Sequence, residues 1–301
     1  MEGTSRIRER ARLPLVIPVH PYLYDHHFEG KIILPAVEVL QHLAGSVQAY
    51  LPNAYVRHMR AATFDRFLYI EKNSQVIAAC NELEVYESGR ILSKLITIDR
   101  IRGTMTRTKV HAAVSFTSAG ERVTEMPSNT MSLPEDICYK ISSQKLYSDL
   151  VPFGPSYQNV RGDVLLSERG AVARVYAEDN QAPSGPLGSP FPFDGALHVA
   201  CAWGQRYSRV VAFPVGFKER VIVKPTIPGD TYHCRLSPVS MIGESLLFDI
   251  WIHDLTGDLH EEIRGVIMRD VSGGRVKPPG WVLYGHPVPP FDKGGAGRIL
   301  S

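Results

Sequence analysis

The stretch HPYLYDHHFEGKIILP (residues 20–35) runs directly into AVEVLQHLAGSVQAYL (residues 36–51), and together they decide the fold of the first half of the chain. Apolar residues recur every three or four positions through the second segment, which is the spacing of an amphipathic helix. Pro35 suits the first position of this helix, because a helix leaves the N–H there unpaired, and Pro52 ends it. The sequence therefore predicts a helix that is preceded by a loop and packs one face on a core.

The loop before this helix and a second helix start, FPFDGALH, each carry a polar side chain suited to chemistry. His26 stands in the pattern H-x-x-x-G-x-x-x-x-P, and Asp194 opens the pattern D-x-x-x-H. Asp194 and His198 are four residues apart, so they share a helical face. A structural interpretation is available for each: a lone histidine near a helix start is usually structural, and Asp194 suits an N-cap. Together, however, a histidine and a carboxyl group across a buried substrate can move a proton and a hydroxyl.

Each half of the chain predicts one helix and several long antiparallel strands. In the first half the predicted strands are 62–70, 75–86, 91–101 and 106–116. In the second half a short helical piece at 139–150 precedes strands at 160–166 and 171–177, a helix at 194–208, and strands at 217–223, 231–240, 245–254 and 260–270. The expected organisation is residues 1–125 as one half, 126–138 as a linker, 139–275 as the other half and 276–301 as a Gly/Pro-rich tail. We predict an α+β duplication, in which each sheet wraps around its own helix.

Composition narrows the classes of function. The chain has 301 residues, 44% of them hydrophobic and 21% charged, with a net charge of +2. No long basic run favours nucleic acid, and the segment 6–12 is expected to be a solvated arm. No apolar run approaches the ~20 residues that span a bilayer. With no signal peptide and no C-x-x-C pair among four cysteines, a cytoplasmic protein is expected.

Other catalytic chemistries find little support in the sequence. His20, Asp25, His26 and His27 could ligate a metal, but adjacent side chains on extended backbone point to opposite faces, so His26 and His27 should not converge. No metal site is therefore expected. The sequence contains no G-x-S-x-G nucleophile elbow, and no G-x-G-x-x-G or P-loop that would favour a nucleotide.

Four motifs, taken in order, resemble one known family. Residues 20–35 look like the first signature of polyketide-synthase dehydratase domains, and FDGALH (193–198) looks like their second. YSDLVPFGPSYQ (147–158) resembles their intervening Y-x-x-L … G-P-x-F-Q element, and AFPVGFK (212–218) resembles the segment after the catalytic helix. The resemblance extends over roughly residues 14–270.

The resemblance implies a double hot-dog fold and a hydro-lyase that converts a 3-hydroxyacyl thioester on an acyl carrier protein to a 2-enoyl thioester, in polyketide or fatty-acid biosynthesis. It implies that His26 is the base, that Asp194 is the acid, and that His198 orients Asp194. A neutral imidazole is poised as a base near pH 7, and a carboxyl group in an apolar cleft can be protonated and act as an acid. No cofactor is implied beyond the carrier's phosphopantetheine. The residues expected to contact the substrate are Gly30, Pro35, Ala36, Phe153, Gly154, Pro155, Tyr157 and Phe193.

Two departures bear on specificity. The family usually has glycine where this chain has Ala36, next to the helix N–H groups that would bind the enolate oxygen. The G-P-x-F-Q element has Tyr157 in place of phenylalanine. It is also compact, and in this it resembles the dehydratase domains of polyunsaturated fatty-acid and enediyne synthases. Double-bond isomerases, product-template cyclases and non-catalytic carrier-docking domains share this fold and remain alternatives. A hot-dog thioesterase has no motif here. A monomer and a homodimer through an edge strand are both open.

Overall fold

The computed structural model describes residues 5–102, 105–118, 139–179, 185–242 and 244–285. The elements of the first half are β1 (Ile7–Pro18), the 3₁₀ turn η1 (Pro21–Asp25), β2 (His27–Phe28), β3 (Lys31–Ile32), α1 (Ala36–Tyr50), β4 (Ala54–Phe64), β5 (Val76–Tyr86), β6 (Arg90–Arg102) and β7 (Met105–Ser118). The elements of the second half are β8 (Tyr139–Ser142), α2 (Ser143–Lys145), the π turn η2 (Leu146–Leu150), the 3₁₀ turn η3 (Pro155–Tyr157), β9 (Val160–Ser167), β10 (Gly170–Tyr176), α3 (Phe191–Trp203), the π turn η4 (Gly204–Ser208), β11 (Phe213–Ile222), β12 (Thr231–Ile242), β13 (Ser245–His253), β14 (Leu259–Arg269) and α4 (Gly280–Tyr284).

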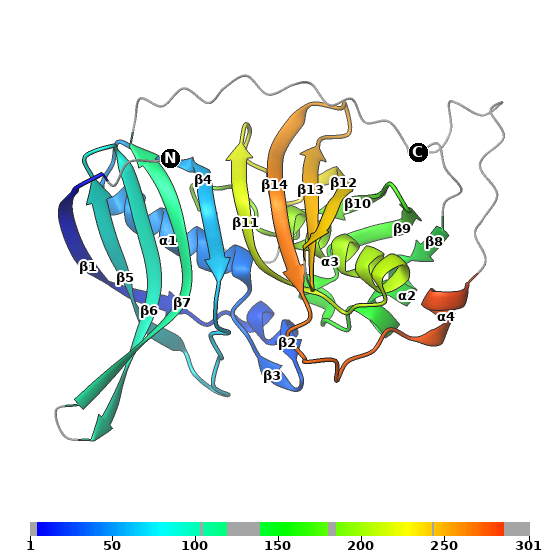
Figure 1. The fold of residues 1–301 in the computed structure, drawn as a ribbon, viewed down its shortest axis with the longest axis horizontal. Helices are drawn as coiled ribbons and strands as arrows, with labels where there is room; N and C mark the ends of the chain where they lie inside the picture. Colours follow the sequence, from blue (N-terminus) through cyan, green and yellow to red (C-terminus); the bar gives the residue numbers. More distant parts are fainter. Residues whose placement is uncertain (1–4, 103–104, 119–138, 180–184, 243, 286–301) are drawn as a thin grey trace.

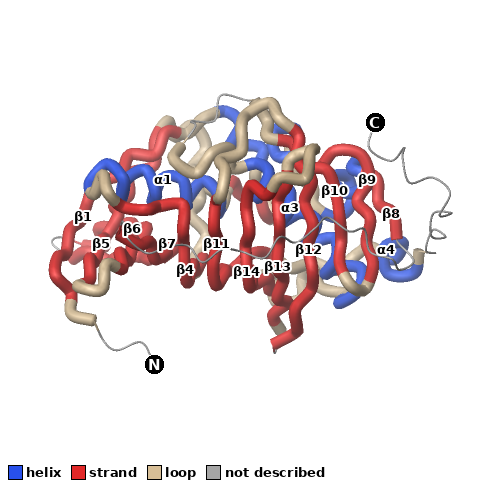
Figure 2. The backbone as a smooth tube through the Cα atoms, turned by 90° about the horizontal axis from the view of Figure 1, so that it is seen from above, coloured by secondary structure: helices blue, strands red, loops and turns tan. Residues whose placement is uncertain are grey.

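A single sheet of 12 strands crosses the molecule in the order β1-β5-β6-β7-β4-β11-β14-β13-β12-β10-β9-β8. All of its ladders are antiparallel. The first half supplies the strands from β1 to β4, and the second half supplies those from β11 to β8. The halves join where β4 pairs with β11, with Met59 opposite Arg220. Helices α1 and α3 lie behind this sheet, with α1 behind the first half and α3 behind the second (Figure 1). Seen from above, both helices lie on the same side of the strands (Figure 2).

The two long helices form where they were expected, but both begin differently from the prediction. Pro35 is the N-cap of α1, so Ala36 is its first helical residue. Pro190 caps α3, which begins at Phe191, and Asp194 therefore lies inside the first turn rather than at the N-cap. Prolines are tolerated in the first turn of a helix because the N–H groups there have no helical partner. Helix α3 can therefore begin before Asp194, the residue that was expected to be its N-cap. The consequence is that the Asp194 side chain is free of a capping role.

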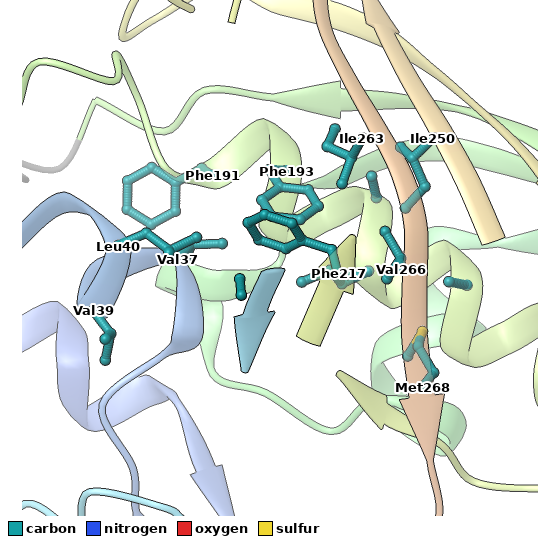
Figure 3. Close-up of a cluster of buried hydrophobic side chains, with 14 of the residues drawn as sticks. Val37, Val39, Leu40, Phe191, Phe193, Phe217, Ile250, Ile263, Val266 and Met268 are labelled. Carbon is teal, nitrogen blue, oxygen red and sulfur yellow. The ribbon is translucent and has the colours of Figure 1, made fainter. Parts of the chain in front are cut away.

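The core is continuous between the halves. Figure 3 shows Val37 and Leu40 of α1 beside Phe191 and Phe193 at the start of α3, with Phe217 of β11 completing the cluster. The Phe193 and Phe217 rings meet edge to face, with centroids 6.3 Å apart. Every residue of α3 is buried, as its small apolar residues on almost every face predict.

Equivalent backbone hydrogen bonds show that the second half repeats the plan of the first. The residue before each N-cap donates its N–H to the loop that follows β4 or β11. The Leu34 N–H donates to the Leu68 carbonyl oxygen, and the Ser189 N–H donates to the Thr226 carbonyl oxygen, both at 2.9 Å. The fourth residue after the cap is Val39 in α1 and Asp194 in α3. The duplication is therefore preserved in the backbone but not in the chemistry, because only α3 carries a carboxyl group at that place.

Three sequence predictions of elements are wrong. The basic segment expected to be a solvated arm is strand β1, whose residues alternate between half-buried and exposed and pair with β5. Its prolines at 14 and 18 are tolerated because β1 is an edge strand. The strand predicted at 62–70 is β4, which begins earlier, at Ala54, and ends at Phe64. The piece predicted as helix from 139 begins instead as β8, which pairs with β9.

The predicted linker, residues 126–138, lies outside the described residues, as does the tail beyond residue 285. The described part of the tail crosses the surface: Arg275 forms a bidentate ion pair with Glu29, and α4 buries Val282 completely. Within the part of the chain that the structure describes, no helix is long and apolar enough to cross a membrane.

Candidate active site

His26 follows η1 and is held by a hairpin. Its Nδ1 lies 3.0 Å from the carbonyl oxygen of Ile33, and the Ile33 N–H donates to the His26 carbonyl oxygen at 3.0 Å. A carbonyl oxygen can only accept, so Nδ1 carries the proton and Nε2 keeps a free lone pair. The hairpin turn has positive φ at Glu29 (47°) and Gly30 (74°), which a two-residue turn of this kind requires. Gly30 therefore shapes the loop that presents His26.

The second half braces this loop from the other side. The N–H of Gly154 donates to the Asp25 carbonyl oxygen and the N–H of Ser156 donates to Asp25 Oδ2, both at 2.8 Å. A Cβ on Gly154 would lie 2.3 Å from Asp25 Oδ1, so this close approach needs glycine. The Gly-Pro element thus fixes the segment that carries His26.

Asp194 lies in the first turn of α3, with 5% of its surface exposed. Its Oδ2 lies 3.1 Å from Nε2 of His198 and accepts a hydrogen bond from Nδ2 of Asn159 at 3.3 Å. The hydroxyl of Tyr147 lies 3.2 Å from His198 Nδ1. The i,i+4 pairing of Asp194 with His198 follows from the sequence pattern, whereas Asn159 is 35 positions away and gives no local signal.

One cavity joins these groups. It has a volume of about 100 Å³, is mostly apolar, and is lined by His26 from the first half and by Asp194 and His198 from the second. His27, the next residue, is exposed, as expected for adjacent residues on extended backbone. Ala36, at the start of α1, and Phe153 also line the cavity. The two halves thus each contribute one proton-transfer group to the same apolar space.

Six of the residues expected to contact substrate do not line this cavity: Gly30, Pro35, Gly154, Pro155, Tyr157 and Phe193. Tyr157 is completely buried and packs edge-on against the His26 ring, with centroids 5.1 Å apart. Phe193 packs under the Arg220 guanidinium at 4.5 Å, and Arg220 is itself paired with the buried Glu261. These two aromatic residues therefore pack in the core that supports the site.

The apolar surroundings act on His26. Burial lowers its pKa to about 4, and the nearby Asp194 opposes this shift only in part. His26 is therefore neutral at neutral pH, which is the form that can accept a proton. Among the described residues, no group of three or more His, Cys, Asp or Glu side chains could hold a metal ion.

Glu38 is a second buried carboxyl group close to the site. Its side chain, on α1, accepts a hydrogen bond from the Tyr22 hydroxyl at 3.2 Å and is only 4% exposed. Burial raises the pKa of Glu38 from 4.5 to about 7. The sequence gives no hint of this, because a glutamate between two valines on an amphipathic helix usually faces solvent.

Replacing Glu38 with glutamine is expected to stabilise the protein at alkaline pH. A carboxyl group whose pKa is raised by folding opposes folding increasingly as pH rises from its unfolded value of 4.5 to its folded value of about 7. The free energy of unfolding of Glu38→Gln should therefore exceed that of wild type by roughly 3 kcal/mol near pH 8, and by much less near pH 5. Urea denaturation at the two pH values measures this, and an equal difference at both would contradict it.

Comparisons with known proteins agree on one family. The family model described as the polyketide synthase dehydratase N-terminal domain matches residues 120–278. No curated protein sequence matches this chain. Among solved structures, a trans-AT polyketide synthase dehydratase domain from Brevibacillus brevis is 16% identical, with a TM-score of 0.70 over 89% of this chain and 96% of that one.

Two further structures give the same result. The dehydratase domain of a mycocerosic acid synthase-like polyketide synthase is 13% identical, with a TM-score of 0.68 over 89% of this chain and 94% of that one. A monomeric dehydratase domain from a trans-AT polyketide synthase split module is 12% identical, with a TM-score of 0.69 over 87% of this chain and 100% of that one. These matches confirm the double hot-dog fold. Because the family model also covers more than half of the sequence, the chain belongs to the polyketide synthase dehydratases, hydro-lyases that remove water from 3-hydroxyacyl intermediates.

Proposed function

We propose that this chain dehydrates a 3-hydroxyacyl thioester delivered by an acyl carrier protein, with His26 as the base and Asp194 as the acid. The observation that carries the proposal is that these two groups, from different halves of the chain, line one apolar cavity. Such a cavity excludes bulk water, which strengthens the interaction of each group with the reacting atoms.

In the proposed reaction Nε2 of His26 removes a proton from C2 of the substrate. The electron pair of that C–H bond forms the C2=C3 double bond, and the C3–O bond breaks. Asp194 gives its proton to the departing hydroxyl, which leaves as water. The thioester acidifies the C2 proton, so the reaction needs no cofactor beyond the phosphopantetheine that carries the acyl group.

The start of α1 is suited to bind the thioester oxygen as negative charge develops on it. Ala36 is the first residue of this helix and lines the cavity. The first N–H groups of a helix have no internal partner and carry partial positive charge, so they can donate to an oxyanion. The alanine in place of the usual glycine leaves that N–H available.

The test is mass spectrometry of a 3-hydroxyacyl group on an acyl carrier protein, and on pantetheine, after incubation with the protein. We expect the loss of one water molecule, faster from the carrier than from pantetheine. If no water is lost, and a 2-enoyl thioester is not hydrated in the reverse direction either, dehydration is refuted for these substrates. A shifted double bond without loss of water would instead identify an isomerase.

The acid limb of the kcat/KM profile should lie well below pH 6.5. The base must be neutral in the free enzyme, and burial holds the pKa of His26 at about 4, so protonation inactivates the enzyme only as pH falls toward that value. The rate of enoyl formation can be followed from about pH 8 to pH 4, with circular dichroism at each pH as the control for unfolding. A midpoint near 6.5 in folded protein would show that the apolar surroundings do not lower the pKa of His26.

A further inference from the structure

Asn159 contacts the Asp194 carboxyl group from a buried position behind it. It is completely buried at the start of the segment that leads into β9, and the Tyr176 N–H donates to its carbonyl oxygen at 2.7 Å. Gly195, the residue after Asp194, would bring a Cβ to 3.3 Å from Asn159 Cβ, so α3 packs directly against it. From this position Nδ2 of Asn159 donates to Oδ2 of Asp194.

The same oxygen faces His198. Nε2 of His198 lies 3.1 Å from Oδ2 of Asp194 but has no aligned hydrogen bond, so Asn159 makes the better-directed contact. The Tyr147 hydroxyl accepts from the Val160 N–H at 2.8 Å and can give its one proton to His198 Nδ1. His198 then carries its own proton on Nε2. Two N–H groups therefore lie close to Oδ2, which favours Oδ1 as the oxygen that carries the proton of the acid.

We propose that Asn159 is a positioning residue that directs the transferable proton of Asp194 to Oδ1 and stabilises the carboxylate left after transfer. This inference rests on the proposed role of Asp194 as the acid. A hydrogen bond to the carboxylate stabilises the ionised form, so the acid gives up its proton more readily. Asn159 makes no contact with the cavity and acts only through Asp194.

Other charged or titratable groups act on Asp194 from every element around it, and they are unchanged by a substitution at Asn159. They are His26 before β2, Glu38 on α1, Tyr147 in η2, Tyr157 in η3 and His198 on α3. Any change in pH profile caused by an Asn159 variant can therefore be assigned to the lost amide, as long as these groups stay in place.

Asn159→Leu, which is similar in size but has no donor, tests the proposal, and Asn159→Ala is the second variant should the leucine not fit. We expect kcat to fall about 10- to 100-fold, the effect of one hydrogen bond to a charged group, with little change in KM. The alkaline limb of the kcat profile should move to higher pH, because the ionised acid has lost a hydrogen-bond donor. Loss of packing alone would not be expected to lower kcat and also move the alkaline limb of its pH profile upward.

Asn81 provides the matched control. It is equally buried, lies in the first half, and accepts a hydrogen bond from Ser93 at 2.8 Å. Asn81→Ala should lower thermal stability and leave the pH profile in place. An unchanged kcat in a folded Asn159 variant would overturn the proposal. So would a downward shift of the alkaline limb, which would mean that the Asn159 oxygen accepts a hydrogen bond from the protonated acid. If Asp194→Asn retains full activity, the proposed function fails, whatever the Asn159 variants do.

Discussion

Replacing His26 with alanine is expected to lower kcat by ~10² or more, the usual contribution of a positioned general base. The cause is the loss of Nε2, the lone pair that the hairpin keeps free by tying Nδ1 to the Ile33 carbonyl. The fold should survive, because the substitution removes one side-chain hydrogen bond, worth ~1 kcal/mol, and leaves the Ile33 N–H to His26 backbone bond intact.

The neighbouring histidine is the control for this experiment. His27 is exposed and does not line the cavity, so His27→Ala should retain wild-type kcat. Initial rates of enoyl formation and melting temperatures of both variants would be compared with those of wild type. A His26→Ala variant that is folded and still turns over at more than about a tenth of the wild-type rate would remove His26 from the chemistry.

Asp194→Asn is the second substitution for which we expect a loss of ~10² or more in kcat. Asparagine has nearly the same shape and can keep a contact with Asn159, but it has no proton to give to the departing hydroxyl. Asp163→Asn is a suitable control, since Asp163 is a half-exposed carboxylate paired with Lys140 at 2.7 Å, away from the cavity. Wild-type turnover by Asp194→Asn, measured in the same assay, would show that another group supplies the proton.

The helices and most strands could be predicted because their signals are local. The three- and four-residue spacing after Pro35 is realised in α1, and the alternation in the second half is realised in β12, β13 and β14. Strand β1 is not predicted from its charge, because a basic segment suggests a solvated arm. The alternation of its arginines with apolar residues such as Leu13 and Leu15 is, however, typical of a strand with one buried face. The charge of this segment therefore gives the wrong prediction, whereas the alternation of its apolar residues indicates the strand.

The site could be predicted only in part. His26, Asp194 and His198 stand out because they belong to short patterns, and the structure brings them to one cavity. Their meeting depends on the pairing of β4 with β11, which no local pattern encodes. Asn159 and Glu38 gave no signal for the same reason, since their partners lie on other elements. The family resemblance predicted substrate contacts for Tyr157 and Phe193, and the structure has both buried in the core.

The central claim is that the proton lost in dehydration leaves C2 and is taken by His26. It is tested most directly with a 3-hydroxyacyl carrier protein deuterated at C2, incubated with wild type and with His26→Ala and analysed by mass spectrometry. We predict that wild type forms a 2-enoyl thioester that has lost the hydroxyl and one of the two deuterium atoms, because His26 takes that deuterium while Asp194 protonates the hydroxyl, and that His26→Ala does not form this product at a comparable rate. Loss of ordinary water with both deuterium atoms retained, or equal deuterium loss in the two proteins, would contradict this account.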